Sequence, residues 1–475
     1  MSAIYISAAH KSSGKTTVSI GLARALVERG ISLQTFKKGP DYIDPLWLGA
    51  ASGRPCYNLD FYTQSREEIM ACYARRMAGR SMALIEGNKG LFDGLDIEGS
   101  NSNAAMAAFL ATPVVLVINC RGMTRGIAPL LLGYQAFDTQ IEIAGVILNQ
   151  VGGDRHERKL REVVDYYTDI PVLGALQADD RLQIDERHLG LIPSNEADTS
   201  ERMIALLAGA VRQSVDLDRL LEIASKAPPA AETAVTSMEK LQDSTAVEAI
   251  RIGYARDKAF GFYYPDDLEK LRQLGAELIP FDTINDTYLP DVDGIFIGGG
   301  FPETAMEALE ANHRMQRAIA DFIEAGGPVY AECGGLMYLT RSLSWQGKKC
   351  RMAGIIPADT VMHEKPQGRG YVRLRDRGNG PWPAASSGQG PVGETISAHE
   401  FHYSALEGLD ATPDHFAYEV LRGTGIDGRN DGYFYKNLLA SYTHMRNVGG
   451  NHWVERFVAH VRSCRVGSNS KVNDV

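Results

Sequence analysis

The chain has 475 residues, too many for one hydrophobic core of ordinary size, so two or three domains are expected. Its 49 basic and 59 acidic residues give a formal net charge of −10, which disfavours nucleic-acid binding because such binding needs a broad basic surface. Its six cysteines are widely spaced without a CxxC pair, which argues against a disulfide framework or structural zinc site and favours a reducing, cytoplasmic compartment. No apolar stretch is long enough to span a bilayer, so no membrane partner is expected.

Short β-branched segments alternate with helical patterns through the first half of the chain. Continuous apolar strands separated by amphipathic helices predict an α/β domain whose parallel sheet is covered on both faces. Met1–Ala9 is apolar but short and lacks a basic leader, so it is interpreted as the start of the sheet and not as a signal peptide. The expected strands are Ile4–Ala8, Leu33–Phe36, Met82–Glu86, Val114–Asn119, Gly145–Asn149 and Val172–Leu176, and the expected helices include Thr17–Arg29 and Glu157–Tyr167.

The second half repeats this alternation of strands and helices. Between the halves, a segment rich in Ala, Pro, Thr and Ser predicts a linker at 227–247. We therefore expect one domain at 1–226, a second at 248–463, and a polar, disordered tail at 464–475. The expected strands of the second domain are Arg251–Tyr254, Glu277–Pro280, Gly294–Ile297 and Pro328–Ala331.

A phosphate-binding loop is indicated directly after the first expected strand. The sequence Ala-His-Lys-Ser-Ser-Gly-Lys-Thr-Thr at 9–17 leads from that strand into a helical pattern, which is the order that a phosphate cradle requires. Gly14 lets backbone N–H groups approach an anion, Lys15 reaches the terminal phosphates, and the Thr16 hydroxyl can ligate Mg²⁺. Ala9 replaces the usual first glycine, and a serine-rich turn that merely caps a helix is the alternative.

Carboxylates for a magnesium ion follow two of the neighbouring strands. Asp41 and Asp44 come after the second strand, and Glu86 ends the third. Each alone is an ordinary solvated acid of a turn, but the C-terminal ends of parallel strands meet beside the phosphate loop. We therefore expect a metal site made of Thr16, Asp41 and Glu86.

A cysteine nucleophile is indicated in the second half. Pro-Val-Tyr-Ala-Glu-Cys-Gly-Gly-Leu-Met at 328–337 has Cys333 at a sharp turn between a strand and a helix, where helix N–H groups should favour the thiolate. Gly334 permits the tight turn. The glycine loop at 298–300 ends another strand and could turn a backbone N–H toward an oxyanion, so Gly299, Gly300 and Gly334 are the expected oxyanion hole. A buried core thiol is the alternative for this cysteine.

A thiolate nucleophile needs a histidine as proton shuttle. The candidates are His399 and His402 in one segment and His444 in another. The spacing His-Glu-x-x-His does not occur, which leaves a metalloprotease without support.

Taken together, these motifs resemble those of the cobyrinic acid a,c-diamide synthases and of related glutamine-dependent enzymes that amidate tetrapyrroles. The resemblance runs from residue 3 to about residue 446 and rests on motifs in a fixed order. They are Ser-Ser-Gly-Lys-Thr-Thr (12–17), Lys-Gly-Pro-Asp-Tyr-Ile-Asp-Pro (38–45), Glu-Gly-Asn-Lys-Gly-Leu-Phe-Asp-Gly (86–94), Gly-Val-Ile-Leu-Asn (145–149), His-Leu-Gly-Leu-Ile-Pro (188–193), Ala-Arg-Asp-Lys-Ala-Phe (255–260), Gly-Gly-Gly-Phe-Pro-Glu (298–303), Glu-Cys-Gly-Gly-Leu-Met (332–337) and His-Glu-Phe-His-Tyr-Ser (399–404).

The resemblance implies a fold and an activity for each half. The first half would be a P-loop domain like that of dethiobiotin synthetase, and the second a class I glutaminase-like domain with a flavodoxin-like α/β fold. ATP and Mg²⁺ would activate an acetate carboxylate of a tetrapyrrole polycarboxylate, and L-glutamine would supply ammonia to form the amide. A homodimer is one assembly that this family would allow.

The resemblance also implies roles for single residues. Cys333 would be the glutaminase nucleophile and His444 the histidine that activates it; the usual orienting glutamate two residues later is absent, because that position holds Arg446. Asn149 would read the adenine edge, in a nucleotide site completed by Gly14, Lys15, Thr16 and Thr17. The residues bordering the acid substrate would be Tyr42 and Asp44.

Two departures from the family pattern leave open which tetrapyrrole is the substrate. The segment Asn447–Trp453 replaces the usual continuation after the final histidine, and Gly368–Arg375 is rich in arginine. Those arginines are either a solvated edge strand or a binding face for a polycarboxylate macrocycle. Cobyrinate is the expected substrate, with sirohaem or a metallo-sirohydrochlorin as the alternative. Outside this class, the chain could be a P-loop regulatory ATPase with an inactive glutaminase-like domain, or a glutaminase that serves a partner.

Overall fold

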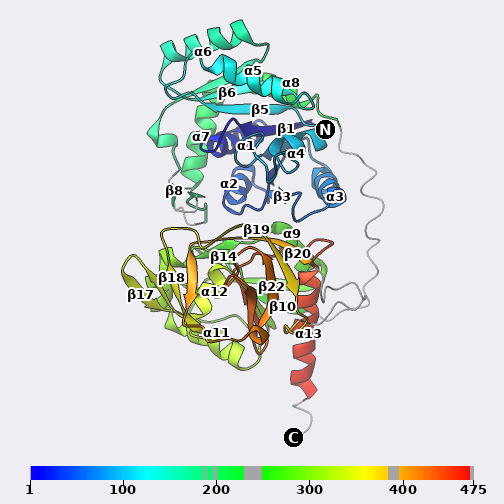
Figure 1. The fold of residues 1–475 in the computed structure, drawn as a ribbon, viewed down its shortest axis with the longest axis vertical. Helices are drawn as coiled ribbons and strands as arrows, with labels where there is room; N and C mark the ends of the chain where they lie inside the picture. The colour runs from blue at the N-terminus through cyan, green and yellow to red at the C-terminus, as the bar shows by residue number, and fades with distance from the viewer. Residues whose placement is uncertain are drawn as a thin grey trace. The chain divides into compact units, whose positions relative to one another are not determined.

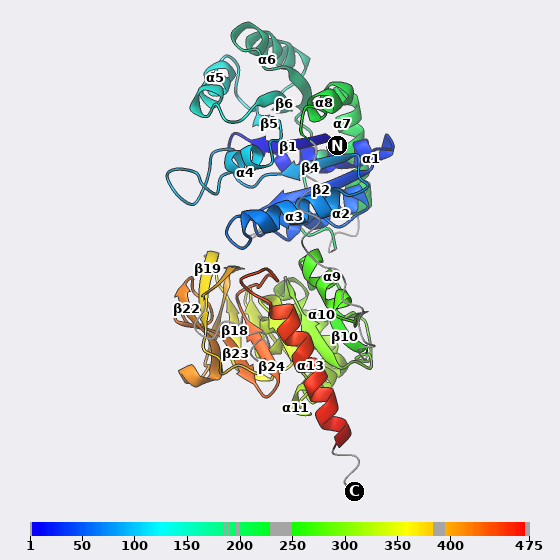
Figure 2. The same cartoon turned by 90° about the vertical axis from the view of Figure 1, so that its right-hand side faces the viewer.

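The computed structural model describes residues 2–184, 186–187, 190–195, 200–228, 249–382 and 395–470. These residues form two compact units, Met1–Glu239 and Lys240–Val475, shown in Figures 1 and 2. The division falls inside the expected linker 227–247, of which residues 229–247 lie outside the described part of the chain.

The first unit is built on a seven-stranded sheet with the strand order β3-β2-β4-β1-β5-β6-β7. All neighbouring strands are parallel, as the continuous apolar runs predict. The strands are β1 (Ser2–Ala8), β2 (Leu33–Lys38), β3 (Tyr57–Leu59), β4 (Met82–Glu86), β5 (Val114–Asn119), β6 (Ile143–Val151) and β7 (Val172–Gln177), with the short pair β8 (Glu186–Arg187) and β9 (Gly190–Leu191) beside them.

Helices cover both faces of this sheet. One apolar cluster joins the sheet to α3, α4, α5 and α6, and a second joins its other face to α1, α2, α7 and α8. Figure 2 shows the helices of this unit around its sheet. The helices are α1 (Lys15–Glu28), α2 (Ile43–Ser52), α3 (Arg66–Met77), α4 (Asn103–Phe109), α5 (Ile127–Phe137), α6 (Asp154–Tyr167), α7 (Ser200–Ser214) and α8 (Leu217–Ala224). The expected doubly covered parallel sheet is therefore confirmed.

The second unit contains a nine-stranded mixed sheet with the order β12-β10-β13-β15-β24-β23-β22-β19-β20. The pairs from β12 to β24 are parallel, and those from β24 to β20 are antiparallel. These strands are β10 (Ile250–Ala255), β12 (Ala276–Phe281), β13 (Gly294–Ile297), β15 (Val329–Glu332), β19 (Gly368–Asp376), β20 (Thr395–His402), β22 (Phe416–Arg422), β23 (Asn430–Tyr435) and β24 (Leu438–Ser441).

Two smaller sheets and five helices complete this unit. One apolar cluster packs α10, α11 and α12 on one face of the parallel strands, and another packs α9 and α13 on the opposite face. The helices are α9 (Pro265–Gln273), α10 (Met306–Ala311), α11 (His313–Glu324), α12 (Gly334–Leu339) and α13 (Trp453–Ser470). The smaller sheets pair β11 (Phe260–Phe262) with β14 (Gly299–Gly300), and order β16 (Thr340–Trp345), β17 (Lys348–Arg351), β18 (Ile356–Met362) and β21 (Ser404–Glu407) as β17-β16-β18-β21.

The last helix of the second unit runs into the segment 464–475, which is expected as a tail. Helix α13 continues to Ser470, past the expected domain end at residue 463. Arg465 holds the helix there, because its guanidinium donates to the carbonyl of Ala249 at 2.8 Å and lies 3.5 Å from Asp293. Residues 471–475 lie outside the described part of the chain.

The arginine-rich segment is not the edge strand that one of its two interpretations expected. It forms β19, which lies between β22 and β20 and is therefore not an edge strand. Its arginines Arg369, Arg373 and Arg375 nevertheless alternate outward and are exposed.

Within the described residues, none of the helices combines the length and apolar character needed to cross a membrane.

Candidate functional site

The first candidate site is the loop between β1 and α1. Ser12 and Gly14 have φ angles of 62° and 81°, in the left-handed region, and α1 begins at Lys15 directly afterwards. A Cβ atom on Gly14 would lie 2.0 Å from Nδ2 of Asn149, which itself donates to the Ser13 carbonyl at 2.9 Å. Glycine is thus required at 14 both for its backbone angle and for its lack of a side chain.

Charged side chains converge beside this loop. Nζ of Lys15 donates to Oε1 of Glu86 at 2.8 Å, and the Thr16 hydroxyl donates to the same oxygen at 2.9 Å and to Oδ2 of Asp44 at 3.2 Å. Nζ of Lys37 donates to Oε1 of Glu86 at 2.7 Å and to the Asp44 carboxylate. The parallel register pairs Lys37 of β2 with Glu86 of β4, which explains why the two side chains meet.

Burial and close pairing shift the titration of this cluster. Burial alone would raise the pKa of Glu86, but Lys15 and Lys37 hold it below its ordinary value. Burial lowers the pKa of Lys15. Burial, and then the charge of Asp41, raises the pKa of Asp44 to about 7. The resting site therefore holds its lysines against carboxylates, and a bound anion would compete for those lysines.

Of the three expected magnesium ligands, Thr16 and Glu86 contact each other, and Asp41 makes other contacts. Oε2 of Glu86 is buried without a hydrogen-bond partner, beside the Thr16 hydroxyl, which fits a metal ligand. Oδ1 of Asp41 instead accepts the backbone N–H groups of Ile43 and Asp44 at 2.9 and 3.2 Å, so it caps the start of α2. Across the described ranges, no three His, Cys, Asp or Glu side chains are grouped to hold a metal ion.

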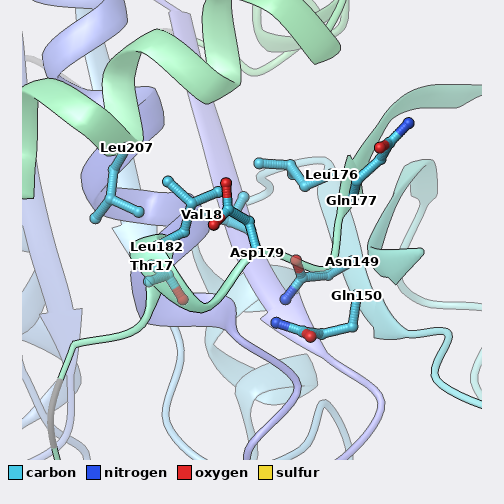
Figure 3. Close-up of a pocket in the computed structure, with 9 residues that line it drawn as sticks. All are labelled: Thr17, Val18, Asn149, Gln150, Leu176, Gln177, Asp179, Leu182 and Leu207. Atoms are coloured by element: carbon cyan, nitrogen blue, oxygen red, sulfur yellow. The ribbon is translucent and has the colours of Figure 1, made fainter. Parts of the chain in front are cut away.

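A pocket opens next to the phosphate loop, as Figure 3 shows. Thr17 and Asn149, both expected at a nucleotide site, line it together with apolar and amide side chains. The full lining is Thr17, Val18, Asn149, Gln150, Leu176, Gln177, Asp179, Leu182 and Leu207. Apolar walls with a few amide groups suit a flat heterocycle such as a nucleotide base. The other expected substrate residue of this unit, Tyr42, is buried directly before α2.

The second candidate site is the turn between β15 and α12. Cys333 has φ 47° and ψ −99°, a strained conformation for a residue with a side chain, and its N–H donates to the carbonyl of Ser441 at 2.7 Å. A Cβ atom on Gly335 would lie 2.3 Å from the carbonyl oxygen of Ile297, so this position also needs glycine. Such a turn holds a nucleophile at the point where strand becomes helix.

The expectation that the helix would favour a resting thiolate is wrong. Burial raises the pKa of the Cys333 thiol, the charges of Glu303 and Glu332 raise it further, and the opposing effect of the Gly334 N–H is too weak. The residue Cys333 is 7% exposed, which agrees with this effect of burial.

His444 lies next to the residue that precedes this turn. Its Nδ1 lies 3.5 Å from Oε2 of Glu332, which directly precedes Cys333 in the sequence. The ring of His399 stacks on that of His444 at 5.0 Å, with the planes inclined by 16°. The third candidate, His402, stacks on Tyr442 instead, at 3.9 Å.

The expected oxyanion-hole glycines lie around the same point. A Cβ atom on Gly299 would lie 2.5 Å from Cε1 of His444, and one on Gly334 would lie 3.0 Å from the backbone nitrogen of Gly300. The N–H of the neighbouring Gly298 donates to the Tyr263 hydroxyl at 3.0 Å, so it is engaged elsewhere. The close backbone approach fits paired N–H donors, although the role of each glycine stays a prediction.

Comparison with known proteins assigns both units. A model described as the CobQ/CobB/MinD/ParA nucleotide binding domain matches residues 5–192, and the CobB/CobQ-like glutamine amidotransferase domain matches residues 251–451. A cobyrinate a,c-diamide synthase from Magnetococcus marinus is 45% identical over 95% of this chain and 95% of its own. The chain belongs to the cobyrinate a,c-diamide synthase family. Proteins of the same name from Archaeoglobus fulgidus (41% identical, 94% of each chain) and Methanosarcina acetivorans (40% identical, 94% of this chain and 92% of its own) agree.

Several residues of this cobyrinate a,c-diamide synthase family member were missed by sequence reasoning. Lys37 faces Glu86 of the neighbouring strand β4, and Glu332 faces His444 in the segment that follows β24. His399 was considered only as an alternative to His444. A signal was available for the first two: each is a charged residue that ends an apolar strand, Lys37 near the end of β2 and Glu332 at the end of β15.

Proposed function

We propose that this protein is a cobyrinate a,c-diamide synthase, which uses ATP and glutamine to convert the a and c acetate carboxylates of cobyrinate into amides. The main support is the 45% identity with a protein of that name over 95% of both chains. The chain also matches both domains of such an enzyme, and the candidate site in each domain is called a half-site below. The phosphate loop with its lysines, and the buried residues Cys333 and His444, supply the two kinds of chemistry that such an amidoligase needs.

The first half-site activates the carboxylate. The substrate oxygen attacks the γ-phosphorus of ATP, which gives an acyl phosphate and ADP. Lys15 leaves Glu86 for the phosphates, and Lys37 adds positive charge at the same strand ends. Mg²⁺, held by Thr16 and Glu86, would neutralise charge on the β- and γ-phosphates.

The second half-site releases ammonia. The Cys333 proton passes to His444 as the sulfur attacks the carboxamide carbon of glutamine, and the N–H groups of Gly299, Gly300 and Gly334 stabilise the oxyanion. The imidazolium then protonates the departing nitrogen, which leaves a thioester. Water hydrolyses that thioester to glutamate. In the first half-site, ammonia displaces phosphate from the acyl phosphate and forms the amide.

Substrate contacts are proposed for each unit by itself. In the first unit they are Asp44, which accepts from the Thr16 hydroxyl, and Tyr42, directly before α2. In the second unit, the exposed Arg369, Arg373 and Arg375 of β19 offer cationic groups for carboxylates. Two of these arginines already have partners: Arg375 pairs with Glu419 at 2.9 Å, and Arg369 lies over the ring of Phe401. The assembly as a homodimer and the cytoplasmic location stay predictions; the cysteines of the described residues are all free thiols, as a reducing compartment requires.

Mass spectrometry of the pigment tests the substrate. With ATP, Mg²⁺ and glutamine, we expect two carboxylates of cobyrinate to become amides and sirohaem to remain unchanged. Amidation of sirohaem alone would overturn the cobyrinate assignment and keep the reaction class. ATP hydrolysis without an amide on either pigment would favour the regulatory ATPase.

A further inference from the structure

The residue that would orient the catalytic histidine of this glutaminase is replaced by a cation. Arg446 is buried, donates to Oδ2 of Asp266 at 2.9 Å, and lies over the Tyr264 ring at 5.0 Å. An arginine cannot accept a proton or stabilise an imidazolium. We infer that Glu332, which directly precedes the nucleophile, is the carboxylate that positions His444. This inference rests on the proposed function, because it assigns a residue to the glutaminase half-site.

The sheet brings Glu332 to the histidine. Strands β15 and β24 are parallel neighbours, and their register pairs Glu332 with Ser441. Both strands therefore end at the same edge, where β15 continues into the Cys333 turn and β24 into the segment that carries His444. One strand end thus supplies the nucleophile and the carboxylate, and its neighbour supplies the base.

Two donors fix the orientation of this carboxylate. Oε1 of Glu332 accepts the Tyr330 hydroxyl at 2.6 Å and the N–H of Met445 at 2.9 Å. Oε2 is the oxygen that faces Nδ1 of His444 at 3.5 Å. Glu332 is 2% exposed, so solvent does not screen this contact.

This orientation determines which nitrogen of His444 acts as the base. A carboxylate can only accept, so it favours the tautomer with the proton on Nδ1 and leaves the lone pair on Nε2. Nε2 then takes the proton of the Cys333 thiol, and Glu332 stabilises the imidazolium that forms. The ring of His399 stacks on that of His444. Burial, and then the charges of His444 and Arg446, hold the pKa of His399 well below its usual range, so it stays neutral.

The test is the change Glu332→Gln, which keeps the size and the Oε1 acceptor. Its amide would donate to Nδ1 and favour the tautomer with the proton on Nε2, which cannot accept the thiol proton. We expect kcat for glutamate release to fall about 100-fold, while KM for glutamine stays within about twofold of the wild-type value. An Asp→Asn change in a serine-protease triad costs roughly 10⁴-fold. A smaller loss is expected for Glu332→Gln because the 3.5 Å contact between Glu332 and His444 is longer than an ordinary hydrogen bond. Amidation driven by ammonium chloride should equal that of the wild type.

Glu400→Gln is the matched control. Glu400 is also 2% exposed, also lies beside a histidine, with Oε2 3.7 Å from His402, and accepts the N–H groups of Thr424 and Gly425. Its variant should keep wild-type kcat, which separates a positioning effect from the general cost of altering a buried glutamate.

Three outcomes decide the proposal. A Glu332→Gln enzyme with wild-type kcat overturns it, and so does a variant in which glutamine-driven and ammonium-driven amidation fall together, because that pattern marks a structural role. If Glu332→Gln does not fold, Tyr330→Phe takes its place: removing the hydroxyl that holds Oε1 should lower kcat about tenfold at unchanged KM, and an unchanged kcat overturns the proposal. Failure of the wild type to release glutamate would instead refute the proposed function.

Discussion

The lack of a side chain at Gly299 makes room for the imidazole of His444, the proposed catalytic base. A methyl group there would lie 2.5 Å from Cε1 of His444, closer than non-bonded carbon atoms can approach. His444 is held from behind by Glu332 and by its stack with His399, so the ring cannot simply retreat.

We therefore expect Gly299→Ala to lower kcat for glutaminase activity at least about 100-fold, as expected when a catalytic group is misplaced by about 1 Å. Amidation driven by ammonium chloride should be retained, because the first half-site is untouched. Gly450→Ala is the control, since a Cβ atom at 450 meets nothing within 4 Å. Wild-type glutaminase activity in Gly299→Ala would show that His444 does not act from this position.

Residues whose function depends on local sequence could be predicted, and residues whose function depends on a distant partner could not. Gly14, Lys15 and Cys333 each sit in a strand–turn–helix pattern that is visible within ten residues. Glu332 was missed because its partner His444 is brought to it by the pairing of β15 with β24, which no local pattern reveals. The resting state of the thiol was wrongly predicted for a similar reason, since its burial depends on the whole unit.

At the scale of elements, the junction of β20 with the segment after β24 depends on a buried histidine. The backbone groups of His399 and His444 pair across this junction, with the His444 N–H donating to the His399 carbonyl at 2.8 Å. Burial, then the neighbouring His444 and Arg446, lowers the pKa of His399 well below its ordinary value of 6.5. Because the unfolded chain binds a proton near pH 6.5 and the folded chain does not, stability from this group is present above pH 6.5 and is lost as pH falls.

His399→Asn should therefore reduce the sensitivity of the fold to acid. At pH 5.5, the wild type should lose about 1.4 kcal/mol relative to pH 7.5 through this residue, equivalent to roughly 3 °C in Tm. Thermal unfolding at both values of pH measures the difference. The exposed His313 is the control: His313→Asn should retain the wild-type shift. An unchanged shift in His399→Asn would mean that the buried imidazole is not neutral.

Strands with continuous apolar sequence were predicted nearly to the residue, because burial on both faces leaves a clear pattern. Expected strands such as Met82–Glu86, Val114–Asn119 and Gly294–Ile297 match the observed bounds. The antiparallel half of the second sheet, from β23 to β20, was not predicted as a sheet, because its strands lack the continuous apolar sequence of the parallel strands. In β19, for example, exposed arginines alternate with buried residues. Helix α13 extends beyond its expected end because Arg465 contacts residues far away in sequence.

At the scale of the whole molecule, the chemistry is divided between two units with separate cores. The residues proposed to activate the carboxylate, from Lys15 to Glu86, lie in the first unit, and those proposed to release ammonia, Cys333, His444 and Glu332, lie in the second. This division predicts that each half-reaction can be removed without abolishing the other.

The most direct test compares Cys333→Ser and Lys15→Ala with the wild type, using cobyrinate, ATP and Mg²⁺ with either glutamine or ammonium chloride. Cys333→Ser should form the diamide from ammonium chloride at the wild-type rate and, with glutamine, form less than about a hundredth of the wild-type amount. Lys15→Ala should form no diamide from either nitrogen source while it still releases glutamate. A Cys333→Ser enzyme that still amidates with glutamine, or a Lys15→Ala enzyme that loses both activities equally, would contradict the division of chemistry between two independent sites.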